Sequence, residues 1–159
     1  QLGDFRQIRN VTDRQLKLID NVSAKVSSDL AAFGKAHDRY GLTQGDLLPE
    51  NIMVCDDGIR LIDFDDTGES WVLFEFATAL IDLAGSEYFD PCLAALISGF
   101  RELRALPDDH LVMLPTFMMA RILSYVAHTV SRSHLDQAEA GQQMMLAMLE
   151  EHGTAYLAS

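Results

Sequence analysis

The sequence predicts a mainly α-helical domain that carries one small β-hairpin. The chain has 159 residues, of which 48% are hydrophobic, and this length and composition suit one globular domain with a buried core. Through most of the chain, apolar side chains recur every three or four residues, the spacing of amphipathic helices. The clear exception is the turn signal Asp56-Asp57-Gly58 between two short apolar runs, which predicts a hairpin.

The helices follow from the apolar spacing and from local capping signals. The first is predicted over about 13–38, and Thr12 followed by Gln15 has the spacing of a capping box at its start. Further helices are predicted over about 71–83, 90–104, 108–132 and 135–151. Pro115 is expected to break or kink the helix that contains it, because proline lacks the backbone N–H that a helix interior needs.

The charge and the cysteines exclude several classes of partner. A formal net charge of -12 argues against nucleic acid and against anionic membrane surfaces, since both require clustered Lys and Arg. No uninterrupted apolar run is long enough to span a bilayer. Cys55 and Cys92 are isolated from each other and read as free thiols in a reducing compartment, so we expect a cytoplasmic location.

Two polar segments, one on either side of the predicted hairpin, contain the residues that could bind a metal or transfer a proton. Asn51 lies just before the first strand and Asp63 near the end of the second, so strand pairing should bring them into one region. An amide oxygen and a carboxylate are hard ligands suited to Mg²⁺. Asp46, five residues before Asn51, is placed to accept a proton from a hydroxyl. With a bound nucleotide, these groups are the parts that phosphoryl transfer requires.

The same two segments resemble a known family, the aminoglycoside phosphotransferase, choline kinase and homoserine kinase group. Its usual pattern, His-Gly-Asp-Leu-His-Pro-x-Asn and then Ile-Asp-Phe-x-Asp, is similar to residues 44–51 and 62–66 here. The resemblance covers most of the chain and is specific over 40–80. It implies that 1–159 form the C-terminal lobe of a protein-kinase-like α+β fold. In that lobe the catalytic loop would be 43–51, the metal-binding hairpin 52–66 and the helical remainder 70–157.

The resemblance also implies a role for each residue that matches the motif. Asp46 would be the catalytic base, and Asn51 and Asp63 would hold Mg²⁺. Asp65 and Asp66 would be secondary candidates beside the metal or the substrate. The implied activity is ATP-dependent phosphotransfer to an alcohol group of a small molecule, such as an aminoglycoside, choline or homoserine.

Two residues that are expected to support the catalytic loop differ from the family pattern. Gln44 stands where the family usually has His; it retains hydrogen-bonding capacity but cannot titrate. Glu75 stands where the family usually has Asp, so the acid is kept on a side chain one methylene longer. We expect both residues to support the catalytic loop.

The chain lacks the elements that bind most of the nucleotide in complete kinases. It contains no Gly-x-Gly-x-x-Gly, and its only lysines are Lys17, Lys25 and Lys35, all within the first predicted helix. No residue is therefore a candidate for the ATP lysine. We expect that an N-terminal ATP lobe is missing, that 1–159 alone are inactive, and that the apolar surface left around the cleft promotes self-association.

Two other interpretations remain open at this point. In the first interpretation, the lobe is a non-catalytic remnant that only binds a ligand. The missing lysine supports this interpretation, and the intact Asp46, Asn51 and Asp63 argue against it. In the second, residues 62–67 resemble the first motif of haloacid-dehalogenase phosphatases, with Asp63 as nucleophile and Asp65 as acid or base. That fold requires a downstream Lys and alternating strands and helices, and the remainder of this sequence predicts neither.

Overall fold

The computed structural model describes residues 8, 10–131 and 138–159. They form two compact units: residues 1–34 with 115–159, and residues 35–114. Within the described ranges, no helix is both long enough and apolar enough to cross a membrane. Of the first ten residues, only residues 8 and 10 are described. The predicted start of the last helix, at 135, lies outside the described residues.

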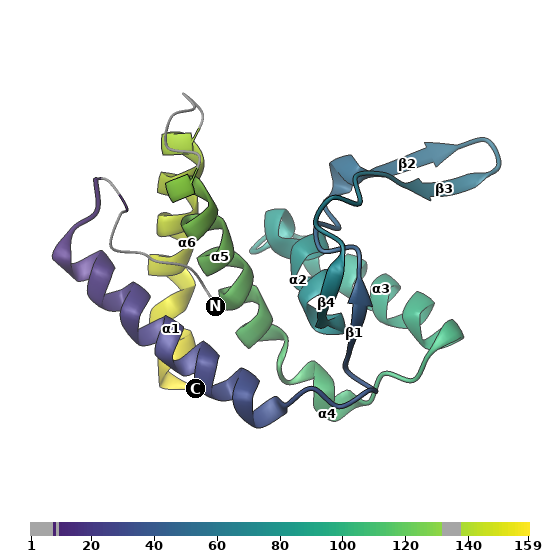
Figure 1. The fold of residues 1–159 in the computed structure, drawn as a ribbon, viewed down its shortest axis with the longest axis horizontal. Coiled ribbons are helices and arrows are strands. Elements are labelled where there is room, and N and C mark those ends of the chain that lie inside the picture. The colour runs from purple at the N-terminus through teal and green to yellow at the C-terminus, as the bar shows by residue number, and fades with distance from the viewer. Residues whose placement is uncertain (1–7, 9, 132–137) are drawn as a thin grey trace. The chain divides into compact units, whose positions relative to one another are not determined.

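The described residues of the first unit form three helices, α1 (Asp13–Phe33), α5 (Leu114–Ser131) and α6 (Ala138–Ala158) (Figure 1). The predicted capping box is present at the start of α1, where Thr12 and Gln15 bond each other's backbone N–H groups. The helix ends at Phe33 instead of near 38, because Gly34 adopts a positive φ of 73° as its cap. The interior side chains of these helices are less than 2% exposed: Ile19, Val22, Val26, Phe117, Leu123, Leu146 and Leu149.

A polar cluster joins the three helices. Asp29 on α1 accepts hydrogen bonds at one carboxylate oxygen from Tyr156 on α6 (2.7 Å), from Lys25 (3.1 Å) and, more weakly, from Thr116 on α5 (3.4 Å). Burial alone would raise the pKa of Asp29, but the bonds from Tyr156 and Lys25 outweigh it and lower that pKa. Burial, together with the Asp29 carboxylate, raises the pKa of Tyr156 to about 12. The cluster therefore holds a charged acid and a neutral phenol together.

Replacing Tyr156 by phenylalanine is expected to lower the free energy of unfolding by about 1 kcal/mol, because Asp29 loses its shortest hydrogen bond. The pKa of Tyr156 is raised in the folded state. The neutral Tyr156 hydroxyl therefore contributes fully to the free energy of unfolding below pH 10, and this contribution is lost as the pH rises through about 12. Urea unfolding near neutral pH and in alkali measures both effects. The control, Tyr88→Phe, changes a side chain that is 61% exposed and should leave the midpoint unchanged.

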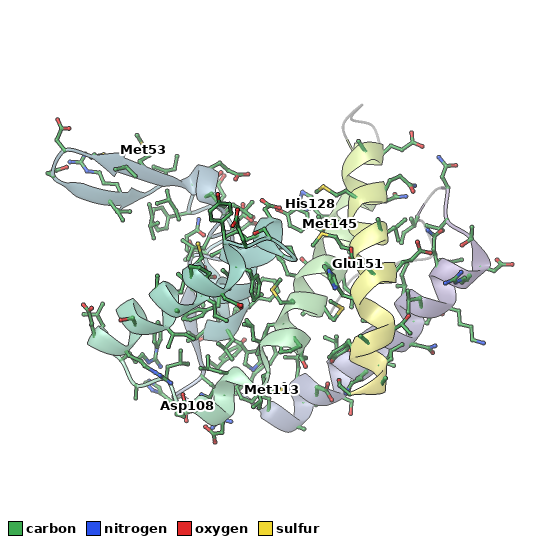
Figure 2. All side chains as sticks on the ribbon, turned by 180° about the vertical axis from the view of Figure 1, so that it is seen from behind. Met53, Asp108, Met113, His128, Met145 and Glu151 are labelled. Carbon is green, nitrogen blue, oxygen red and sulfur yellow. The ribbon has the colours of Figure 1, made fainter. Side chains whose placement is uncertain are left out.

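The second unit contains the predicted hairpin. Strands β2 (Ile52–Cys55) and β3 (Gly58–Leu61) pair antiparallel, with Ile52 opposite Leu61 and Cys55 opposite Gly58. The hairpin prediction is confirmed, although the returning strand, which the apolar run predicts over 59–64, ends at Leu61. In Figure 1 the hairpin extends away from the other elements of its unit, and Met53, labelled in Figure 2, lies on β2.

The unit also contains a second two-stranded sheet, which the sequence patterns did not predict. Strand β1 (Tyr40–Thr43) pairs antiparallel with β4 (Gly68–Trp71), so that Tyr40 faces Trp71 and Thr43 faces Gly68. The rings of Tyr40 and Trp71 meet edge to face, with centroids 5.2 Å apart. This sheet closes a loop of chain that contains both polar segments of the candidate site.

The remaining elements of this unit are short helices. They are a 3-10 helix over Pro49–Asn51, α2 (Val72–Leu80), a 3-10 turn over Ile81–Leu83, α3 (Phe89–Leu103) and α4 (Asp108–Leu111). The expected break at Pro115 is confirmed, because α4 ends at Leu111 and α5 begins at Leu114, which leaves the proline in a first helical turn where it is tolerated. The helices predicted over 71–83 and 90–104 thus agree closely with α2 and its following turn and with α3, whereas the helix predicted over 108–132 is divided into α4 and α5.

Candidate active site

The β1–β4 sheet holds the two candidate loops side by side. Strand β1 ends at Thr43 and leads into the loop that carries Asp46, while the segment that carries Asp63 leads into β4 at Gly68. The Thr43 hydroxyl donates to the Gly68 carbonyl at 3.2 Å, where the first loop begins and the second loop ends. The antiparallel pairing therefore brings 44–48 and 62–67 together although the sequence separates them.

Asn51 is the centre of the first group of contacts. Its side chain is buried, and its Nδ2 donates to the backbone oxygen of Asp46 at 2.8 Å and to the Asp46 carboxylate at 3.2 Å. Its backbone oxygen accepts from the N–H of Ile62 at 3.0 Å, which extends the hairpin pairing by one rung. Asp63 follows immediately. The structure thus joins Asn51 to Asp46 through side-chain hydrogen bonds and places the backbone of Asp63 one residue beyond the pairing of Asn51 with Ile62.

Gln44 and Glu75 both contact the loop of Asp46. The side-chain oxygen of Gln44 accepts from the N–H of Asp46 at 2.8 Å, and its Nε2 donates to the carbonyl oxygens of Asp63 and Ile62. Glu75, in the first turn of α2, accepts from the N–H of Gly45 at 2.8 Å. The longer acid therefore reaches the loop, and the amide makes contacts on both loops.

Gly45 belongs to the sequence motif, but the motif alone does not mark it as a site residue. Its φ is 92°, and a Cβ at this position would lie 2.2 Å from the carbonyl oxygen of Asp66. Only glycine allows the two loops to approach so closely with this backbone conformation. The sequence shows only that a glycine is present. The need for glycine arises from the contact with Asp66, 21 positions later in the chain.

The three acids of the second loop lie on an open surface. Asp63, Asp65 and Asp66 are all exposed, and Asp65 and Asp66 form the turn that precedes β4. Asp63 has a φ of 55°, which is uncommon for a residue with a side chain. Asp66 approaches the first loop through its backbone oxygen at Gly45, and Asp65 follows Asp63 at the rim of the site.

A family model described as "APH: Phosphotransferase enzyme family" matches residues 2–110, which include every residue of this site. The chain belongs to this family. A comparison with curated proteins finds no significant match.

Solved kinase structures share the fold of this phosphotransferase-family chain. The structure of a microcompartment-associated aminopropanol kinase aligns with a TM-score of 0.81 and 25% identity, over 99% of this chain and 50% of that one. An amicoumacin kinase in complex with AMP-PNP, Ca²⁺ and Ami aligns with a TM-score of 0.74 and 18% identity, over 95% of this chain and 48% of that one. The family member described here therefore spans about half the length of the kinases that it matches.

Asn51 and Asp63 of this phosphotransferase-family site carry oxygen atoms of the kind that bind divalent ions. Because Nδ2 of Asn51 donates to Asp46, the other atom of the amide, Oδ1, is the one suited to a cation. The exposed carboxylate of Asp63 supplies a second hard oxygen. Among the described side chains, no group of three or more His, Cys, Asp or Glu forms a metal site.

The lysines of this family member are distant from these loops in the sequence. Lys17 and Lys25 are on α1. Lys35 lies just past that helix, not within it as predicted, and its ammonium group sits over the rings of Tyr40 and Trp71, 4.5 and 5.3 Å from their centroids. The haloacid-dehalogenase alternative also lacks its framework, since both sheets of the described residues are antiparallel pairs.

Proposed function

We propose that this chain is the catalytic half of an ATP-dependent kinase that phosphorylates an alcohol group of a small molecule. The observation that supports it most directly is the contact of Asn51 with Asp46 and, through its backbone, with the strand end that carries Asp63. These contacts support a site in which Asp46 is the base and Asn51 and Asp63 are the oxygen ligands, the arrangement that phosphoryl transfer uses. The family membership supports the same reaction class.

In this proposal each residue has a separate task. Asp46 accepts the proton of the acceptor hydroxyl, and its orientation is maintained by the amide group of Asn51. Asn51 and Asp63 hold Mg²⁺, which when bound balances the charge of the ATP phosphates. Asp65 and Asp66 add negative charge at the open side of the site, where they would attract a cationic acceptor.

We further propose that the complete enzyme includes an N-terminal lobe that supplies the phosphate-binding lysine. Residues 1–159 span half of the matched kinase chains and contain no glycine-rich phosphate loop. Free thiols at Cys55 and Cys92 support a cytoplasmic location.

Residues 1–159 alone are expected to show negligible turnover, whereas a gene product extended by the upstream sequence should release ADP in the presence of an amino alcohol or aminoglycoside. An enzyme-coupled ADP assay with a panel of such acceptors measures both. The Asp46→Asn form of each chain provides the background. Acceptor-dependent ADP release by residues 1–159 would contradict the need for a second lobe. Nucleotide binding without turnover by the extended chain would favour the non-catalytic remnant.

Self-association of residues 1–159 is expected to involve the β2–β3 hairpin. Strand alternation and register place Ile52, Val54, Ile59 and Leu61 on one face, and Val54 and Ile59 are 85% and 70% exposed. An exposed apolar face of this kind promotes association. Sedimentation velocity should show a concentration-dependent shift that the double variant Val54→Thr, Ile59→Thr removes, since threonine keeps the strand preference. A monomer at all concentrations would contradict the prediction.

A further inference from the structure

Residues 37–39 lead into β1, and we call them the junction because each of the three contacts a different part of the second unit. The backbone oxygen of His37 accepts a hydrogen bond from the guanidinium group of Arg104, the residue that follows α3. The carboxylate of Asp38 lies 3.7 Å from Nε2 of His110, a buried side chain on α4. The junction is therefore held at two points by a part of the chain that is distant in the sequence.

The two groups that hold the junction belong to one stabilised connection between α3 and α4. Arg101, in the last turn of α3, donates from Nε and Nη2 to the backbone oxygen of Leu106, at 2.9 and 2.6 Å. It also pairs with Asp108, the first residue of α4, at 2.5 Å. Leu106 is buried. Because Arg101 ties the end of α3 to the start of α4, Arg104 and His110 are parts of one support.

The junction also joins two supports of the Asp46 loop. It continues into β1, which leads directly to that loop. The backbone oxygen of Arg39 accepts at 3.0 Å from the N–H of Val72, one of the N–H groups at a helix start that have no acceptor within the helix. Val72 begins α2, and Glu75 in the same turn accepts from the N–H of Gly45 at 2.8 Å. A displaced junction would therefore disturb the Asp46 loop both through β1 and through α2.

We infer that Arg104 is a positioning residue for the Asp46 loop and acts on it through the junction. The inference rests on the proposed function for its catalytic consequence, whereas the contacts exist independently of catalysis. A guanidinium group is suited to this task because it stays charged and donates through several N–H groups, and charged donors make stronger hydrogen bonds than neutral ones. Lysine keeps a charged donor, whereas methionine keeps an apolar side chain without one.

Amide hydrogen exchange with NMR detection tests these contacts in residues 1–159. In Arg104→Met, the Val72 amide should exchange about tenfold faster and the Gly45 amide should also accelerate, because their acceptors are less firmly held. Arg104→Lys should keep most of the protection at both amides. The matched control, Arg60→Met, removes an exposed arginine of the hairpin turn that pairs with Asp57, and it should change neither amide.

A third amide separates positioning from a general loss of stability. Ala77 is buried within α2, so its amide exchanges when the unit as a whole unfolds, and its rate should not change in Arg104→Met. Acceleration of Ala77 equal to that of Val72 would show a general loss of stability and would overturn the inference. Unchanged exchange of Val72 in Arg104→Met would also overturn it.

Steady-state kinetics of the extended enzyme measure the catalytic consequence. Arg104→Met should lower kcat about fivefold, with the KM for ATP changed less than about twofold, because the loop that carries the base is displaced while Arg104 contacts the junction. Arg104→Lys should restore most of kcat. An unchanged kcat in Arg104→Met, or equal losses in both variants, would overturn the positioning role. If the wild-type enzyme transfers no phosphoryl group, the proposed function fails, and the exchange of Val72 and Gly45 still decides whether the junction supports the loop.

Discussion

Replacing Asp46 by asparagine in the extended enzyme is expected to lower kcat by about 10²–10⁴-fold with little change in the KM for ATP. The substitution keeps the size of the side chain and one oxygen that can face Asn51, but removes the carboxylate that would accept the hydroxyl proton. General-base assistance contributes a rate factor of this order. Steady-state kinetics with saturating ATP and a varied acceptor measure the effect.

The control for this experiment is Asp57→Asn in the hairpin turn. Asp57 is an exposed acid that pairs with Arg60 at 2.7 Å, and asparagine before Gly58 suits the same turn. This variant removes one negative charge without touching the loops of the site, so its kcat should remain within about twofold of wild type. Near-normal turnover of Asp46→Asn, with the control also normal, would remove Asp46 from the mechanism.

The central part of the site was accessible from the sequence because its geometry is local. A turn signal at 56–58 determines the pairing of β2 with β3, and this pairing alone brings Asn51 beside the segment of Asp63. Only ten residues separate Asn51 from Ile62, so no long-range information was needed. The capping box at Thr12 was predictable for the same reason, since its two partners are three residues apart.

The features that the sequence did not predict depend on contacts between distant segments. Strands β1 and β4 have four residues each and include glycines and polar residues, so neither shows a clear alternating pattern. Their pairing joins residues that are 25 to 31 positions apart. Similarly, the first helix was predicted to reach about residue 38, but the conformation of Gly34 ends α1 at Phe33. Local propensity indicates an element, whereas tertiary contacts determine its partners and its end.

Replacing Gly45 by alanine is expected to lower the free energy of unfolding by about 2–4 kcal/mol and to abolish most turnover of the extended enzyme. Two costs combine at this position. The φ of 92° disfavours any residue with a Cβ, and the new Cβ would lie 2.2 Å from the carbonyl oxygen of Asp66. Because that oxygen belongs to the backbone, relief requires the two loops to separate, which moves Asp46 away from Asp63. Chemical denaturation and kcat measure the two effects.

Two other glycines separate these costs. Gly34 has a φ of 73°, and a Cβ added there would meet no atom within 4 Å, so Gly34→Ala should show the backbone cost alone, about 1–2 kcal/mol. Gly41 has neither a positive φ nor a close neighbour, so Gly41→Ala should stay within about 0.5 kcal/mol of wild type. The close approach of the loops predicts that Gly45→Ala exceeds Gly34→Ala in lost stability and alone impairs kcat. Equal losses of unfolding free energy in Gly34→Ala and Gly45→Ala would contradict a close approach of the two loops. An unchanged kcat in Gly45→Ala would mean that the separation of Asp46 and Asp63 does not limit the reaction.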